Sequence, residues 1–179
     1  MQPRAVGRPV PDEGAAGELD GTGLDATLAA VVAGARRRAV RDGDRQIDTA
    51  HLLHSLLDTD PGARAAIGPR LVRLLGYLVQ RSIGYGIGWQ RGAEGDDAPG
   101  AGPGPVRGHG TFEGPERWSA LAAEAVRDAR RRAARRGAPH ATGVELLAAL
   151  VADPRSRAVE VLAHAGVPAG RLTAHPAPR

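Results

Sequence analysis

The sequence predicts an all-α protein, and three features of its composition support this fold class. Apolar residues make up 42% of the 179 positions, which is enough for a hydrophobic core, whereas aromatic residues contribute only 3%. Residues that favour helices, chiefly Ala, Leu, Arg and Glu, are common, and the β-branched and aromatic residues that favour strands are sparse. We therefore expect Leu, Val and Ala side chains to form a core between helices.

Segments rich in Gly and Pro divide the chain. Residues 1–23 and 84–116 contain Gly or Pro every few positions, which prevents a long helix, so we expect both segments to be flexible. The polar end, 174–179, is expected to be a tail. Two ordered blocks remain, at 24–83 and 117–173.

The two blocks are copies of one unit. Three segments of the first block return in the same order in the second, which indicates an internal repeat. The matched pairs are "ARRRAVRDG" (35–43) with "ARRRAARRG" (129–137), "LLHSLL" (52–57) with "LLAALV" (146–151), and "TDPGARAAI" (59–67) with "ADPRSRAVEVL" (152–162).

The first helix of each copy is expected over about 25–41 and 117–136. In the second copy, apolar residues recur every four positions and make one face. This face consists of Leu121, Ala125, Ala129 and Ala133. Both helices end in arginines followed by Gly43 or Gly137, and cations together with a left-handed glycine are typical of a helix C-terminus.

The second helix of each copy has a start signal in the sequence. It begins at Asp48 or Thr49 in the first copy and at Thr142 in the second, where Glu145 three residues later completes a capping box. Leucines then follow at the spacing of a buried stripe. The stripes are Leu52, Leu53, Leu56 and Leu57 in one copy, and Leu146, Leu147, Leu150 and Val151 in the other.

A third helix is expected to begin at Asp60 and at Asp153, because each is followed by proline, and Asp-Pro favours a helix start. In the second copy this helix ends at Gly166. In the first copy Gly68 interrupts the helix, which restarts in a leucine-rich segment. The corresponding last helix of the second copy, near 169–174, is short.

These motifs resemble the N-terminal domains of Clp ATPases, which carry two repeats of a four-helix unit. Each repeat of that family has a helix ending in a basic stretch and Gly, a Thr-x-His-Leu-Leu-like motif, and then an Asp-Pro motif. The matching segments here are Ile47 to Ile67 and His140 to Val167. No ATPase modules follow the second copy, and the linker is longer than is usual in the family, so the chain resembles a free-standing N-domain.

The resemblance implies a non-catalytic protein-binding module of the cytoplasm, acting as an adaptor, decoy or regulator in Clp-dependent protein quality control. Its partners would be a Clp ATPase, an adaptor or client proteins, bound in the groove between the two copies. The candidate contact residues are Ala50, His51, Val144, Glu145, Arg36 and Arg130.

In ClpC-type N-domains, a glutamate just before the histidine of this motif contributes to phosphoarginine recognition. Ala50 and Val144 stand at the corresponding positions, and neither side chain accepts a hydrogen bond. We therefore expect weak phosphoarginine binding or none, and increased binding if both residues are replaced by glutamate.

Nucleic acid is the alternative partner. Arginine runs at 36–38 and 130–136 could contact phosphates, which would make the chain a nucleic-acid-associated regulator. The net charge of +4 is modest, however, and the aromatic residues used to stack single-stranded bases are missing. No apolar run approaches the roughly 20 residues that span a bilayer, so no membrane association is expected.

The sequence lacks the residues that nucleotide-binding, metal-binding and catalytic sites require. Without lysine the chain has no standard phosphate loop, and without cysteine it has no thiolate metal site. His51 and His54 lie three residues apart, as metal ligands on a helix can, but the sequence offers no convincing third ligand. The serines lie in no nucleophile motif. We expect no catalytic residues, no cofactor and no metal, and thus no enzyme.

Overall fold

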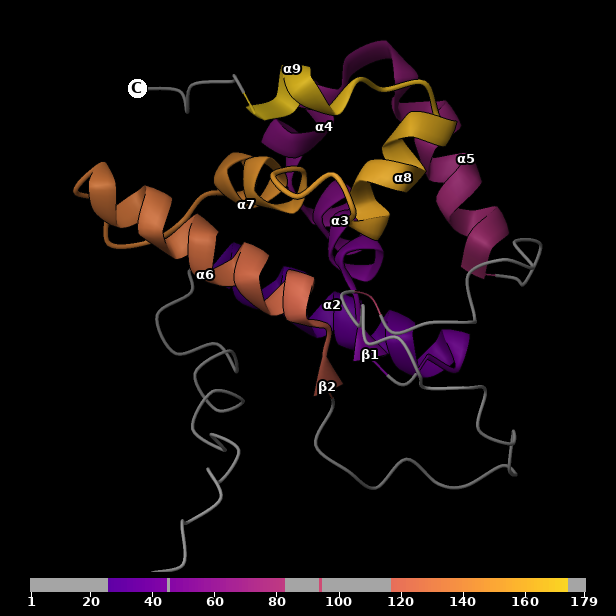
Figure 1. Cartoon of the computed structure of the whole chain (residues 1–179), viewed down its shortest axis with the longest axis horizontal. Helices are drawn as coiled ribbons and strands as arrows, with labels where there is room; N and C mark the ends of the chain where they lie inside the picture. The colour runs from indigo at the N-terminus through magenta and orange to yellow at the C-terminus, as the bar shows by residue number, and fades with distance from the viewer. Residues whose placement is uncertain (1–25, 45, 83–93, 95–116, 174–179) are drawn as a thin grey trace, which may run out of the picture.

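The structure, a computed structural model, describes four parts of the chain: 26–44, 46–82, residue 94, and 117–173 (Figure 1). These parts are mainly helical, as the composition predicts. None of their helices combines the length and the apolar character that crossing a membrane requires. The expected tails at 1–23 and 174–179, and all of the expected linker except Glu94, lie outside the described residues.

Among the described residues, the first half contains four α-helices joined by short connections. In order, its elements are α2 (Ala26–Asp42), β1 (Gln46–Ile47), α3 (Thr49–Thr59), α4 (Pro61–Ile67), the 3-10 turn η1 (Gly68–Arg70) and α5 (Leu71–Ser82). The predicted starts are confirmed, because Asp48 caps α3 and Asp60 caps α4 with proline next. Gly68, with φ at 68°, ends α4 as expected.

The second half also contains four α-helices among the described residues, but its strand precedes the first helix instead of following it. Its elements are β2 (Arg117–Trp118), α6 (Ala120–Arg135), α7 (Gly143–Leu150), α8 (Arg157–His164) and α9 (Ala169–Thr173). The capping box of Thr142 and Glu145 at the start of α7 is confirmed. Gly166 follows the end of α8 with φ at 74°, as expected of a helix stop.

Two predicted helix starts are wrong. Helix α6 begins at Ala120 instead of residue 117, because Ser119 caps it and the two residues before Ser119 are extended. Helix α8 begins at Arg157 instead of Asp153. The Asp153 carboxylate accepts a hydrogen bond from the Arg155 backbone N–H at 2.8 Å, and Ser156 provides the cap.

A short parallel strand pair departs from the all-helical expectation. Gln46 of β1 is in register with Arg117 of β2, and Ile47 with Trp118. Directly after the pair, the backbone N–H of Ser119 donates to the carbonyl of Ile47 at 2.9 Å. The pair therefore holds the start of α6 beside the start of α3.

One hydrophobic core joins the two halves. Figure 1 shows α3 near the centre, with α7 on one side and α8 and α5 on the other. The leucines of both predicted stripes belong to a single cluster of buried side chains. Its most deeply buried leucines include Leu52, Leu53, Leu56, Leu57, Leu146, Leu147 and Leu150.

Candidate functional site

Two of the residues expected to contact a partner lie inside the fold. Ala50 has no exposed surface, and Val144 is 9% exposed. Val144 lies under Gly62, where a β-carbon would be 3.3 Å from the Val144 Cγ2 atom. This burial is at odds with a direct partner contact by either side chain. A glutamate at position 50 would be buried, so the expected increase in phosphoarginine binding is not supported either.

Glu145 is buried as well, and its carboxylate is fully engaged. It accepts a hydrogen bond from the Thr142 backbone N–H at 2.7 Å and takes two from Arg136, at 2.9 and 3.1 Å. Burial opposes ionisation, but the bonds from Arg136 and Thr142 outweigh it and lower the pKa of Glu145. Its role in this structure is that of a helix cap.

The remaining predicted residues, Arg36 and Arg130, occupy matching positions on α2 and α6. Both side chains are half-buried and take part in interactions within the fold. Neither arginine lines the open pocket described below.

Polar side chains from both halves meet at the centre of the molecule. We call this group the polar junction. It consists of Asp48, Thr49, His51, Arg81, Glu94, Ser119 and Arg157.

Glu94 connects three helix starts within the polar junction. Its Oε2 atom accepts hydrogen bonds from the Thr49 backbone N–H at 2.8 Å and from the Ser119 hydroxyl at 2.7 Å. Its Oε1 atom accepts from the Arg157 backbone N–H at 2.6 Å and from the Thr49 hydroxyl. These groups lie at the N-termini of α3, α6 and α8, where free N–H groups favour an anion. A single carboxylate from the intervening segment thus ties the two halves together.

Asp48 is the second buried carboxylate of the junction. Its Oδ2 atom accepts hydrogen bonds from Arg81 at 2.8 Å and Arg157 at 2.7 Å. Burial by itself would raise the pKa of Asp48, but the contacts with His51 and the two guanidiniums hold it far below its usual range. Asp48 is therefore ionised at neutral pH.

His51 lies between acidic side chains. Its Nδ1 atom is 2.8 Å from Asp48 Oδ1, and its Nε2 atom is 3.1 Å from Asp44 Oδ2. Burial lowers the pKa of His51, yet Asp44 and Asp48 outweigh burial and raise it to about 9. Nδ1 also lies 3.1 Å from the Asp48 backbone N–H, a contact that suits the neutral ring. We favour the charged ring, because bonds to a carboxylate are the stronger ones.

Within the described part of the chain, one group of acidic and histidine side chains could offer ligand atoms to a metal ion: Asp44, Asp48 and His51. Their ligand atoms lie within 4.8 Å of one another. Asp48, however, is already neutralised by two guanidiniums, and both ring nitrogens of His51 face carboxylates. We interpret the trio as an ion-pair network. His54, the other histidine of the predicted pair, lies apart from it, and burial followed by Arg38 lowers its pKa to about 4.

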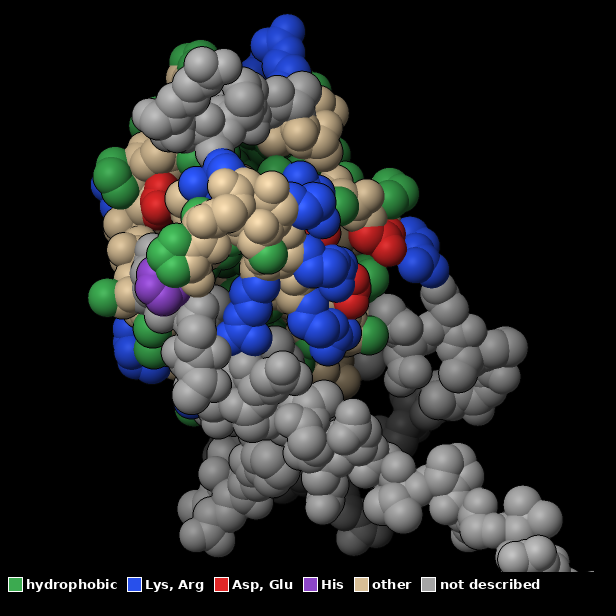
Figure 2. All heavy atoms as spheres, turned by 90° about the vertical axis from the view of Figure 1, so that its left-hand side faces the viewer, with side chains coloured by type: hydrophobic (Ala, Val, Ile, Leu, Met, Phe, Trp, Pro, Cys, Tyr) green, Lys and Arg blue, Asp and Glu red, His purple; other side chains and the backbone are tan. Residues whose placement is uncertain are grey.

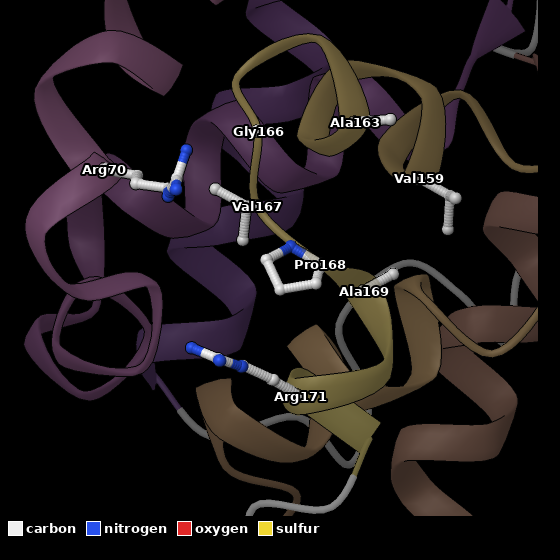
Figure 3. A pocket seen from close by; sticks show the side chains of 8 residues that line it. All are labelled: Arg70, Val159, Ala163, Gly166, Val167, Pro168, Ala169 and Arg171. Atoms are coloured by element: carbon white, nitrogen blue, oxygen red, sulfur yellow. The ribbon is translucent and has the colours of Figure 1, made fainter.

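An open pocket lies on the surface where the halves meet, between η1 and the turn from α8 to α9 (Figure 3). Arg70 enters it from η1 and Arg171 from α9, over a floor of small apolar side chains. No motif of the sequence indicates this pocket, because its walls come from segments far apart in the chain.

The arginines of α6 gather on the face seen in Figure 2, with acidic side chains among them. Arg131 pairs with Glu124 at 2.6 Å, and Arg132 with Asp128 at 2.7 Å. Arg136 pairs with Glu145 of the next helix. Much of this basic run is therefore balanced by acidic neighbours within the protein.

No family model and no curated protein matches the chain. Among solved structures, a chain from preliminary structural investigations of a malarial protein secretion system is similar. The TM-score is 0.56 at 15% sequence identity, over 84% of this chain and 90% of that one. At this identity the similarity concerns the fold alone.

Proposed function

We propose that the chain is a non-catalytic protein-binding module built from two repeats in the manner of a Clp ATPase N-domain. It would act as an adaptor, decoy or regulator in Clp-dependent protein quality control. The proposal rests on the repeated motifs of the sequence and on the way in which the corresponding helices pack.

Reciprocal packing of the two halves is the observation that carries the proposal. Helix α3 of the first half packs against α8 of the second, and the corresponding helix α7 packs against α4 of the first. Within each half, α2 packs on α3 as α6 packs on α7. Such exchange of equivalent contacts is what two similar units related by an approximate twofold axis produce.

The helix ends support the same correspondence. Gly43 and Gly137 follow the first helix of each half with φ of 74° and 71°. Each second helix has a side-chain cap that accepts from the backbone N–H three positions on, Asp48 from His51 and Thr142 from Glu145. The open pocket favours binding over catalysis, because its charged side chains are guanidiniums, which do not exchange protons at physiological pH.

A degradation assay with a Clp ATPase and its peptidase tests the proposal. The client is β-casein, and the same assay is run with an ATPase that lacks its own N-domain. We expect the chain to change the rate of casein degradation by the intact ATPase and to leave the truncated enzyme unaffected. Biolayer interferometry with the ATPase, its adaptors and casein should show which of them the chain binds.

The proposal fails if the chain alters neither rate and binds none of these proteins at up to about 100 μM, a weak affinity for a specific complex. Nucleic-acid binding is then the competing explanation for the arginine runs. A gel shift with duplex DNA that weakens steeply as salt rises would support that reading, although the ion pairs on α6 favour a solvated helix face.

A further inference from the structure

The pocket between η1 and the α8–α9 turn carries two cationic side chains, Arg70 and Arg171. Neither the Arg70 nor the Arg171 side chain makes a hydrogen bond or ion pair with any residue that the structure describes. Both are exposed, and the pocket lining contains no acidic residue. Two guanidiniums in one pocket favour an anionic ligand, because the fork of N–H groups matches a carboxylate.

The apolar floor of the pocket adds a second requirement. Val159, Val167 and Pro168 line it together with Ala169. The volume of about 420 Å³ is at the lower end for ligand pockets, so it suits a short side chain. A ligand that fills the pocket therefore combines carboxylates with an aliphatic group.

The turn after α8 keeps Arg70 available for such a ligand. The last carbonyls of the helix are satisfied within the turn, since the Gly166 N–H donates to Ala163 and the Val167 N–H donates to Leu162. A β-carbon at position 166 would lie only 2.4 Å from the Arg70 Nη1 atom. Glycine thus allows the guanidinium to lie against the turn, as Figure 3 shows.

We propose that this pocket binds an acidic peptide segment of a partner protein, with aspartate or glutamate carboxylates on Arg70 and Arg171 and an aliphatic side chain on the floor. This inference rests on the proposed protein-binding function and names the chemistry of the partner. Free phosphate leaves the apolar floor unused, and no aromatic side chain lines the pocket to stack a nucleobase.

Fluorescence anisotropy with a fluorescein-labelled, C-terminally amidated peptide of alternating glutamate and leucine tests the inference on the full chain. We expect Arg70→Gln and Arg171→Gln each to weaken binding about 5-fold, as an exposed ion pair allows, and the double variant to weaken it further. Arg37→Gln, which removes an exposed arginine of α2 outside the pocket, is the matched control and should change nothing.

Two more comparisons test the floor and the sign of the charge. A peptide with serine in place of leucine, and one with glutamine in place of glutamate, should both bind more weakly. Ala163→Glu, on the exposed rim, should reduce binding by repulsion, whereas Ala163→Gln should reduce it less. Because these positions are exposed, thermal midpoints should match that of the unchanged protein.

The inference is overturned if Arg37→Gln weakens binding as much as Arg70→Gln, if the serine peptide binds equally well, or if inorganic phosphate or polyuridine displaces the peptide from this pocket.

Failure of the proposed function can be distinguished from failure of the pocket inference. If the double variant still alters casein degradation as the unchanged chain does, only the pocket assignment is wrong. If the chain binds the peptide through the pocket but leaves degradation unchanged, only the Clp-dependent role is wrong.

Discussion

At the scale of single residues, Glu94 joins helix starts that are distant in the sequence. Replacing it with glutamine keeps its size but turns one acceptor oxygen into a donor that faces other donors. We expect Glu94→Gln to lower the free energy of unfolding by about 2–3 kcal/mol, because buried donors lose their acceptor. Urea unfolding measures the loss, and the exposed Glu124→Gln should stay within about 0.5 kcal/mol.

The protonation of His51 makes stability depend on pH above neutrality. Its pKa rises from an ordinary 6.5 to about 9 on folding, so between these values the folded protein holds a proton that the unfolded chain releases. The stabilisation is complete below pH 6.5 and is lost as pH rises towards 9, on the order of 3 kcal/mol in all. Unfolding titrations from pH 6.5 to 9 should show the decline, and His51→Gln should flatten it.

His54 produces the opposite slope on the acid side. Burial, with Arg38 nearby, lowers its pKa from 6.5 to about 4, so in this range the unfolded chain takes up a proton that the folded protein excludes. Stability should therefore fall as pH drops from 6.5 to 4, giving a maximum near pH 6.5. His54→Phe should flatten only this acid limb. A steady rise of stability from pH 6.5 to 9 would contradict the assignment of His51, and stability that does not fall from pH 6.5 to 4 would contradict that of His54.

At the scale of helices, two glycines in helix interiors provide a matched pair. Gly34 of α2 faces α3, where an added β-carbon would lie 2.1 Å from the Ser55 hydroxyl, whereas Gly76 of α5 has open space around it. Alanine gains about 1 kcal/mol of helix propensity at either site. We expect Gly76→Ala to stabilise the protein by about that amount, and Gly34→Ala to destabilise it by about 1–2 kcal/mol through overpacking.

A second substitution separates packing from backbone effects at Gly34. Ser55→Ala removes the hydroxyl that an added β-carbon would meet, so it should restore most of the stability lost in Gly34→Ala. Thermal unfolding followed by circular dichroism gives the coupling between the two changes. If the losses are simply additive, the close approach of α2 to α3 at this point is not the cause.

At the scale of the whole molecule, the leucines of both halves share one core, so the halves should unfold together. Leu147 is 1% exposed, and Leu147→Asp would bury an unpaired charge. We expect this variant to lose hydrogen-exchange protection in α2–α5 as well as in α6–α9, whereas Leu147→Met should retain both. Protection that persists in the first half alone, or two separate melting transitions, would contradict a single cooperative unit.

The sequence by itself determined the features that depend on a few neighbouring residues. The caps at Asp48, Asp60 and Thr142 follow from hydrogen bonds that reach only three positions along the chain, and Gly166 ends its helix through its own backbone freedom. The same local reasoning failed at Asp153, because a neighbouring arginine took the carboxylate on which the predicted cap depended.

Tertiary structure alone decided where the functional groups meet. Val144 packs near Gly62 of the opposite half, and the contacts of Glu94 depend on three helix starts that converge only in the folded chain. The strand pair and the pocket around Arg70 and Arg171 likewise join segments far apart in the sequence. Periodicity and caps specify which face of a helix is apolar, but not which residue of another helix that face will meet, because that choice is made by packing of the whole core.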